Sequence, residues 1–186
     1  IRNNENPVVS NSLKKYISEN ILFEDKDLLV FNKPSGLAVH GGSGISMGVI
    51  EAFRSLRKSD EYLELAHRID KDTSGCLIIA KSRLALSKIG ESLQSNQVKK
   101  TYVALVKGNW PKGKSKVNAP LKKNTLLSGE RIVKVDKLGK RSVTNFEITE
   151  KYENTTLLKI NLETGRTHQI RVHCQFSSMP LSLIHI

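Results

Sequence analysis

The feature that most limits how this chain can fold is a polar segment, residues 67–75, that runs directly into an apolar segment at residues 76–80. The polar segment reads His-Arg-Ile-Asp-Lys-Asp-Thr-Ser-Gly, and the apolar one reads Cys-Leu-Ile-Ile-Ala. A short apolar run with β-branched residues, bounded by a glycine-containing turn, predicts a buried strand. The charged side chains before it would then lie in a loop at the end of a sheet, where folds commonly present functional residues.

The rest of the chain alternates short strand patterns with helical ones. Strands are expected at 21–23, 28–32, 76–82, 101–106, 131–136, 141–150 and 154–162. Helices are expected at 10–19 and 83–94. A further helix is expected to follow the loop at 33–42, and another to begin within 164–173. Several consecutive strands are joined by short turns, which favours antiparallel pairing. We therefore predict an α+β fold with a mixed, mostly antiparallel sheet and flanking helices.

Composition excludes several classes of protein. The chain has 186 residues, 38% of them hydrophobic and 26% charged, which predicts a soluble globular protein. No apolar stretch approaches the roughly 18 residues that would span a bilayer, so we expect no membrane span. The two cysteines lie far apart and form no CxxC pair, which favours reduced thiols in a cytoplasmic protein and argues against a structural zinc site.

The positive charge is concentrated in one part of the chain. Residues 97–141 hold thirteen Lys or Arg and two acidic residues, so 13 − 2 = +11 of the total net charge of +12 lies there. Such a basic tract suits a polyanion such as nucleic acid. A solvated face that only keeps the protein soluble is an equal alternative on charge alone, and membrane lipid is a weaker one because no amphipathic apolar face accompanies the lysines.

Four segments in chain order resemble the motif set of the RluA family of pseudouridine synthases: residues 33–40, 67–75, 100–106 and 164–173. Residues 41–51 and 127–131 further resemble the RluC branch, which modifies uridines of bacterial 23S ribosomal RNA. The resemblance covers roughly residues 21–173. It implies the pseudouridine synthase fold and a base-flipping isomerisation of uridine to pseudouridine that needs no cofactor and no metal.

The same resemblance assigns Asp70 as the catalytic aspartate. The reaction breaks the glycosidic bond of uridine and rejoins the base through C5, which requires a charged carboxylate beside the ribose. Whether Asp70 attacks C1′, adds to the uracil ring or removes a ribose proton stays open. Arg171 is expected to pair with Asp70 and keep it ionised. Arg166 is the second candidate for that role and the better candidate for a phosphate contact.

The remaining site residues also follow from the resemblance. Tyr102 is expected to stack on the uracil and to assist proton removal from C5. Arg68 is expected to enter the gap that the extruded nucleotide leaves. His67 and Lys33 complete the predicted RNA-binding set. For His67 a hydrogen-bonding scaffold role is favoured over that of an acid or a metal ligand, and the loop after Lys33 could simply brace the sheet.

Without the family resemblance, these residues have simpler structural interpretations. Asp70 could be a turn aspartate that accepts backbone N–H groups, and Tyr102 could be an ordinary core residue of a strand. A non-catalytic RNA-binding or ribosome-assembly module would explain the basic tract equally well. A phosphotransferase is a third possibility because residues 67–70 loosely resemble a kinase catalytic loop, but the chain has no GxGxxG loop.

The resemblance also predicts the domain organisation and the partners. Residues 1–20 are expected to be a linker that follows an S4-like RNA-binding domain absent from this chain, and residues 21–186 a catalytic domain truncated at its C-terminus. The expected partner is large-subunit ribosomal RNA, without a membrane or a small-molecule cofactor. The oligomeric state stays open, with a monomer favoured.

Overall fold

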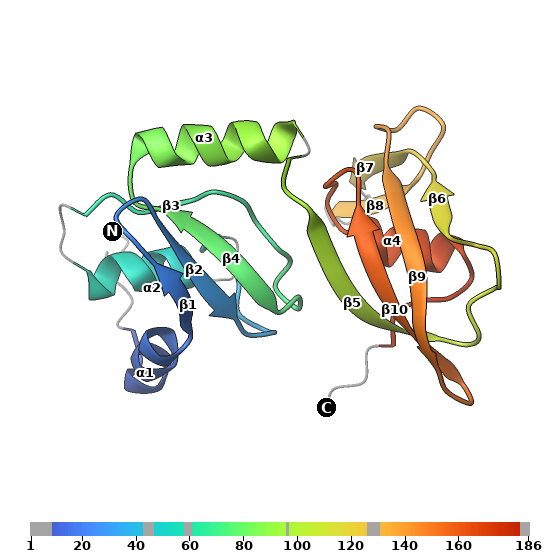
Figure 1. Cartoon of the computed structure of the whole chain (residues 1–186), viewed down its shortest axis with the longest axis horizontal. Coiled ribbons are helices and arrows are strands. Elements are labelled where there is room, and N and C mark those ends of the chain that lie inside the picture. The colour runs from blue at the N-terminus through green and yellow to red at the C-terminus, as the bar shows by residue number, and fades with distance from the viewer. Residues whose placement is uncertain (1–8, 43–46, 58–60, 96, 126–130, 183–186) are drawn as a thin grey trace. The chain divides into compact units, whose positions relative to one another are not determined.

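The computed structural model describes residues 9–42, 47–57, 61–95, 97–125 and 131–182. The chain divides into two compact units, residues 1–97 and residues 98–186. Each unit has its own sheet and its own hydrophobic core (Figure 1).

The first unit contains a four-stranded antiparallel sheet. Its strands are β1 (Ile21–Glu24), β2 (Leu28–Lys33), β3 (Glu64–Leu65) and β4 (Gly75–Ala80), in the spatial order β1-β2-β4-β3. Leu77 and Ile79 on β4 are fully buried, which confirms the predicted strand. In the pairing of β2 with β4, Lys33 lies opposite Gly75. The loop that leaves β2 therefore starts beside the turn that enters β4.

The described part of the first unit also contains three helices: α1 (Asn11–Glu19), α2 (Val49–Leu56) and α3 (Arg83–Gln94). The predicted helices at 10–19 and 83–94 are confirmed, and each begins at a serine whose hydroxyl accepts an N–H of the first turn. Phe31 of β2 packs edge-on against Phe53 of α2, with ring centroids 5.2 Å apart. Ile17 of α1 is also part of this core, so α1 is packed structure within the region predicted as a linker.

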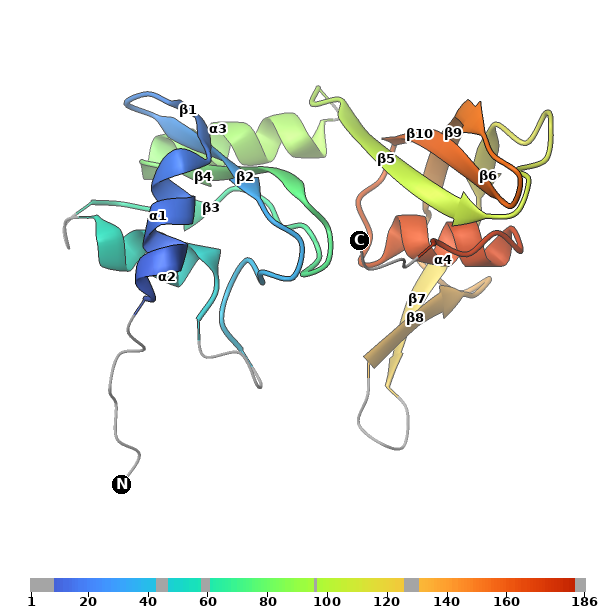
Figure 2. The same ribbon diagram turned by 90° about the horizontal axis from the view of Figure 1, so that it is seen from below.

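The described residues of the second unit form a four-stranded sheet, a two-stranded hairpin and one helix. The sheet is formed by β5 (Lys100–Lys107), β6 (Lys116–Asn118), β9 (Val143–Lys151) and β10 (Thr155–Leu162), in the order β5-β10-β9-β6. The hairpin pairs β7 (Leu121–Thr125) with β8 (Arg131–Val135). Helix α4 (Gln169–Phe176) contacts both β8 and β9. Figure 2 shows α4 against one face of the sheet, with the hairpin beyond the helix.

The predicted α+β class with mostly antiparallel strands is confirmed. Every strand pair in the described residues is antiparallel, and the strands form separate sheets in two units instead of one mixed sheet. Three short strands, β3, β6 and β7, were not predicted, because their sequences lack an apolar run of their own. Within the described residues no helix has the length and apolar character to span a membrane.

Candidate active site

The predicted catalytic aspartate lies on a turn that leads into β4. Asp70 is half-buried, and its carbonyl oxygen accepts the N–H of Thr73 at 3.1 Å. Gly75 follows with φ of +113°, a conformation that side chains rarely adopt, and it allows the turn to enter the strand directly. The carboxylate is thus carried by a tight turn at the end of a buried strand.

Lys33 ties this turn to the loop after β2. Its side chain is 0% exposed, and Nζ donates to the carbonyl oxygens of Pro34 and Leu37 at 2.7 Å each and of Lys71 at 2.8 Å. The carbonyl of Lys71 also accepts the N–H of Gly36 at 2.9 Å. One ammonium group with three protons therefore meets three carbonyls, and it crosslinks the residue next to Asp70 to the loop at 34–37.

The charge on Lys33 is compatible with this environment. Burial lowers its pKa to about 8, while the nearby carboxylates of Asp72 and Asp70 act in the opposite direction. The ammonium form therefore still dominates at pH 7. Because this side chain is buried and its three protons are used, its environment is that of an internal crosslink. This differs from the RNA contact that the sequence predicts for Lys33.

His67 and Arg68 flank the same turn. His67 Nε2 accepts the N–H of Ile78 on β4 at 3.1 Å, so this nitrogen carries no proton. The bond extends the pairing of β3 with β4 toward Asp70, which is the scaffold role considered for His67. The Arg68 side chain is exposed to solvent two residues before Asp70, as a residue that contacts RNA has to be.

Three predicted residues belong to the second unit. Tyr102 is half-buried on β5, opposite Ile160 of β10, and packs against the core of that unit. Arg171 is half-buried on α4, and Arg166 is exposed in the loop before that helix. Asp70 belongs to the first unit, so its pairing with Arg171 stays a prediction.

A buried hydrogen-bond network, which the sequence did not reveal, holds the loop that carries Arg166. Gln169 donates through Nε2 to the carbonyl of Val143 at 3.0 Å and to the hydroxyl of Thr144 at 2.9 Å. Its Oε1 accepts the hydroxyl of Thr164 at 2.8 Å and the N–H of Arg166 at 3.0 Å. The side chain of Gln169 thus joins β9 to residues 164 and 166 of the loop before α4.

His173 completes this network from the next turn of α4. It is 0% exposed, with Nε2 2.9 Å from the carbonyl of Ala119 and Nδ1 2.8 Å from the hydroxyl of Thr144. Since a carbonyl can only accept, Nε2 carries the proton, and in the neutral ring Nδ1 accepts from Thr144. Burial lowers the pKa of His173, whereas its bond to Ala119 acts in the opposite direction. The neutral ring is therefore the form that the folded protein favours.

His168, which precedes α4, adopts a left-handed backbone conformation with φ of 52°. Such a conformation is uncommon for residues other than glycine and costs on the order of 1 kcal/mol. Gln169 and its bonds to Thr164 and Arg166 supply the local structure that can maintain it. Strained residues of this kind are concentrated in binding and catalytic loops, which agrees with the predicted role of this segment.

The described residues contain no cluster of three or more His, Cys, Asp or Glu side chains that could hold a metal ion.

The family model for RNA pseudouridylate synthases matches residues 27–176, so the chain belongs to that family. It is 54% identical over 181 residues to ribosomal large subunit pseudouridine synthase C of Pasteurella multocida and 51% identical over 180 residues to the protein of that name from Escherichia coli strain K12. The predicted RluA family and its RluC branch are thereby confirmed. Each match covers 96% of this chain and 56% of the relative, so the chain spans about half the length of these relatives.

Solved structures agree with this assignment. The human RNA pseudouridylate synthase domain containing 4 superposes with a TM-score of 0.75 over 92% of this chain and 69% of its own, at 27% identity. The human RNA pseudouridylate synthase domain containing 1 gives a TM-score of 0.70 over 87% of this chain and 66% of its own, at 23% identity. The second match supports the fold alone. The predicted pseudouridine synthase fold is confirmed.

Proposed function

We propose that this protein converts uridine to pseudouridine in bacterial large-subunit ribosomal RNA, without a cofactor, and that Asp70 is its catalytic carboxylate. The observation that carries the proposal is the position of Asp70. It lies on a crosslinked turn at the start of β4, inside the region that matches the family model. The names of the curated relatives supply the RNA class. A ribosomal RNA substrate would place the protein in the cytoplasm.

The turn suits a carboxylate that must meet one atom of a bound ribose. A reacting group gains most from being held in a fixed position, because orientation that is set before the reaction lowers the barrier. Lys33 fixes the backbone on one side of Asp70, and His67 fixes the approach on the other. Asp70 is only half-buried, so its side chain can be reached by an extruded nucleotide. The chemical step that it takes is open between attack on C1′, addition to uracil and removal of a ribose proton.

The other residues have supporting roles in this proposal. Arg171 would keep Asp70 ionised through a charge-assisted pair. Tyr102 would stack on uracil and assist removal of the C5 proton once the new bond has formed. Arg68 is exposed and long enough to occupy the space of the flipped base. Arg166 would contact a phosphate near the loop before α4.

A single isosteric change tests the assignment of Asp70. In Asp70→Asn we expect pseudouridine formation to fall by on the order of a thousandfold or more, because the amide can neither act as a nucleophile nor as a base. RNA binding should change little. The matched control is Asp72→Asn, which makes the same chemical change at an exposed carboxylate two residues away. Pseudouridine would be mapped by mass spectrometry in 23S ribosomal RNA isolated from cells that lack the modification.

The experiment also separates the enzyme from a binding module. A non-catalytic RNA-binding protein would bind the RNA in both variants and produce no pseudouridine in any form, including the wild type. Normal turnover in Asp70→Asn would leave the enzyme assignment intact and refute the role of Asp70.

A further inference from the structure

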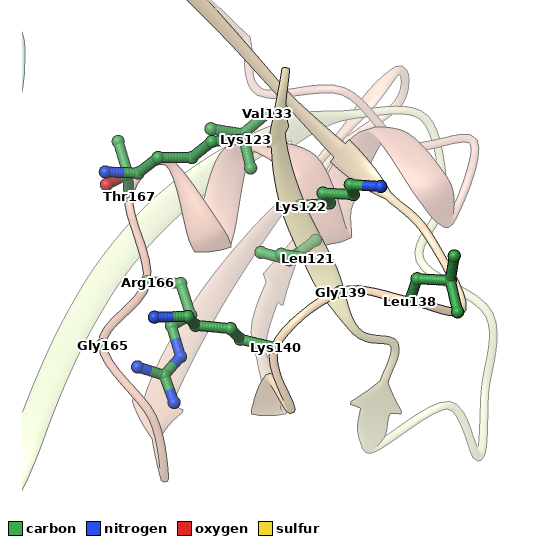
Figure 3. A pocket seen from close by; sticks show the side chains of 10 residues that line it. All are labelled: Leu121, Lys122, Lys123, Val133, Leu138, Gly139, Lys140, Gly165, Arg166 and Thr167. Atoms are coloured by element: carbon green, nitrogen blue, oxygen red, sulfur yellow. The ribbon is translucent and has the colours of Figure 1, made fainter.

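A cleft of about 490 Å³ opens on the second unit, within the size range of roughly 300–1,000 Å³ that is common for ligand sites. Three segments form it: the β7–β8 hairpin, the turn between β8 and β9, and the loop before α4. Its lining consists of Leu121, Lys122, Lys123, Val133, Leu138, Gly139, Lys140, Gly165, Arg166 and Thr167 (Figure 3).

The lining combines cations with apolar surface. Four of the ten residues are Lys or Arg, all four are exposed, and no acidic side chain lines the cleft among the residues that the structure describes. One of the four, Lys122, lies 4.0 Å from the carboxylate of Asp136. Positive potential at an open cleft attracts anions, and the effect is stronger when several cations share one site.

The cations are directed to particular sides of the cleft. In Figure 3 the side chains of Lys123 and Lys140 extend toward the segment at 165–167, which carries Arg166 and the hydroxyl of Thr167. Lys122 and Leu138 extend to the opposite side. This division follows from strand geometry, because the successive residues 122 and 123 of β7 point to opposite faces. Three cations and one hydroxyl therefore belong to the same side.

The backbone that carries these side chains is well anchored. The main chain of Lys140 donates to the carbonyl of Leu121 at 2.8 Å and accepts the Leu121 N–H at 2.9 Å. A Cβ at Gly139 would lie 2.6 Å from the carbonyl carbon of Leu121, so this turn packs directly on β7. Arg166 is held through its N–H by Gln169, and its Nε donates to the carbonyl of Arg141 at 3.3 Å. A site on anchored segments loses little entropy when it binds a ligand.

We propose that this cleft binds the sugar-phosphate backbone of the RNA substrate, with Lys123, Lys140 and Arg166 on phosphate oxygens and Thr167 as an additional hydrogen-bonding group. This deepens the proposed function and rests on it for the identity of the polyanion. Val133, which is half-buried and lies opposite Lys123 in the hairpin, gives ribose and base an apolar surface to contact. That mixture favours an RNA strand over a purely acidic peptide, which would offer charge alone. The cleft thus adds to the proposed phosphate contact of Arg166 and makes one continuous binding surface for the RNA strand.

Charge reversal on two of these residues provides the test. The variant Lys123→Glu/Lys140→Glu changes side chains that are exposed and make no ion pair among the described residues. The control, Lys88→Glu/Lys151→Glu, makes the same change in net charge at exposed sites outside the basic tract. Binding of a fluorescein-labelled oligouridylate would be followed by fluorescence anisotropy across a series of salt concentrations. The emission of Trp110, which is buried in the same unit, would verify folding.

We expect the cleft variant to bind at least about tenfold more weakly than the control and to lose roughly 1.4 from the slope of log affinity against log salt, as for two phosphate contacts to a single strand. In turnover assays KM should rise more than kcat falls. Equal affinity and equal salt slope in the two variants would overturn the proposal. So would polyglutamate that competes as well as RNA, since the cleft would then recognise charge without the nucleotide.

The binding test and the turnover assay distinguish a failure of the cleft proposal from a failure of the proposed reaction. If the wild type forms pseudouridine and both double variants bind RNA equally, the cleft proposal fails and the enzyme assignment stands. If no form of the protein makes pseudouridine but only the cleft variant loses RNA, the cleft proposal stands and the reaction is refuted.

Discussion

Replacing Lys33 with methionine tests whether a buried ammonium group holds the turn that carries Asp70. Methionine keeps most of the length and apolar volume of the lysine side chain, but it has no proton to donate. The substitution would leave three carbonyl oxygens, those of Pro34, Leu37 and Lys71, without the donor that they share in the wild type. The loop at 34–37 and the turn at 70–73 would lose a common anchor.

The expected magnitude follows from two opposing contributions. Hydrogen bonds from a charged donor stabilise a protein by about 1.5–3 kcal/mol each, so three bonds of 2.7–2.8 Å contribute roughly 6 kcal/mol. Burial of the ammonium opposes this. The pKa of about 8 reflects this cost, which for a buried ion is on the order of a few kcal/mol. We therefore expect Lys33→Met to lower the free energy of unfolding by about 3 kcal/mol.

Two amides report on the turn directly. Gly36 donates its N–H to the carbonyl of Lys71, and Thr73 donates its N–H to the carbonyl of Asp70. In Lys33→Met, hydrogen exchange followed by mass spectrometry should show faster exchange at these two amides before it does so in β10 of the second unit. Pseudouridine formation should fall by at least about tenfold, because a displacement of Asp70 by a fraction of an ångström removes its alignment with the ribose.

The control is Lys71→Met. It removes the same charge one residue from Asp70, but its side chain is exposed and its carbonyl remains available to Lys33. Urea unfolding, followed by far-ultraviolet circular dichroism, gives the free energy for both variants. If Lys33→Met proves as stable and as active as Lys71→Met, the buried lysine does not hold the turn, and the reasoning is refuted.

Two further predictions concern packing and pH. In Gly48→Ala the new Cβ would lie 2.5 Å from the backbone of His40, so we expect a loss of about 1–3 kcal/mol in unfolding free energy by urea titration, whereas Gly42→Ala has open space and should change little. His173 has a lowered pKa when folded, so its contribution to stability is complete above pH 6.5 and is lost as the pH falls. The unfolding free energy measured by Trp110 fluorescence should fall below pH 6.5 with a slope of up to about 1.4 kcal/mol per pH unit, and His173→Gln should remove that part of the slope.

Each of these two predictions has a clear contrary result. Equal losses in the two alanine variants would mean that the approach of Gly48 to His40 is not a tight contact. A wild type and a His173→Gln variant with the same pH profile would mean that the buried imidazole is protonated as readily in the folded chain as in the unfolded one.

Local patterns predicted the elements that carry their own signal. The helix at 83–94 begins at a capping serine and has apolar residues at helical spacing, and the strand at 75–80 is a continuous apolar run, so neither depends on distant partners. β7 was missed because its sequence, Leu-Lys-Lys-Asn-Thr, is almost entirely polar. This strand forms through backbone pairing with β8, and no local pattern of side chains predicts that pairing.

The buried position of Lys33 is a feature that the sequence pattern of its strand could have indicated. The family resemblance placed Lys33 among the residues predicted to contact RNA. However, alternation along β2 puts residues 29, 31 and 33 on one face, and Leu29 and Phe31 are both fully buried. The periodicity of the strand thus indicated an inward lysine. Its three acceptors come from loops whose paths depend on the fold.

The sequence by itself determined the family, the class of fold and the identity of the candidate catalytic residues, because motifs and short-range periodicity are properties of neighbouring residues. Only the tertiary structure decided that Lys33 is an internal crosslink, that Gln169 and His173 hold the loop of Arg166, and that Lys123 and Lys140 share a cleft with it. Those relations join residues up to several dozen positions apart. They depend on how strands pair and helices pack, which the linear order of residues does not display.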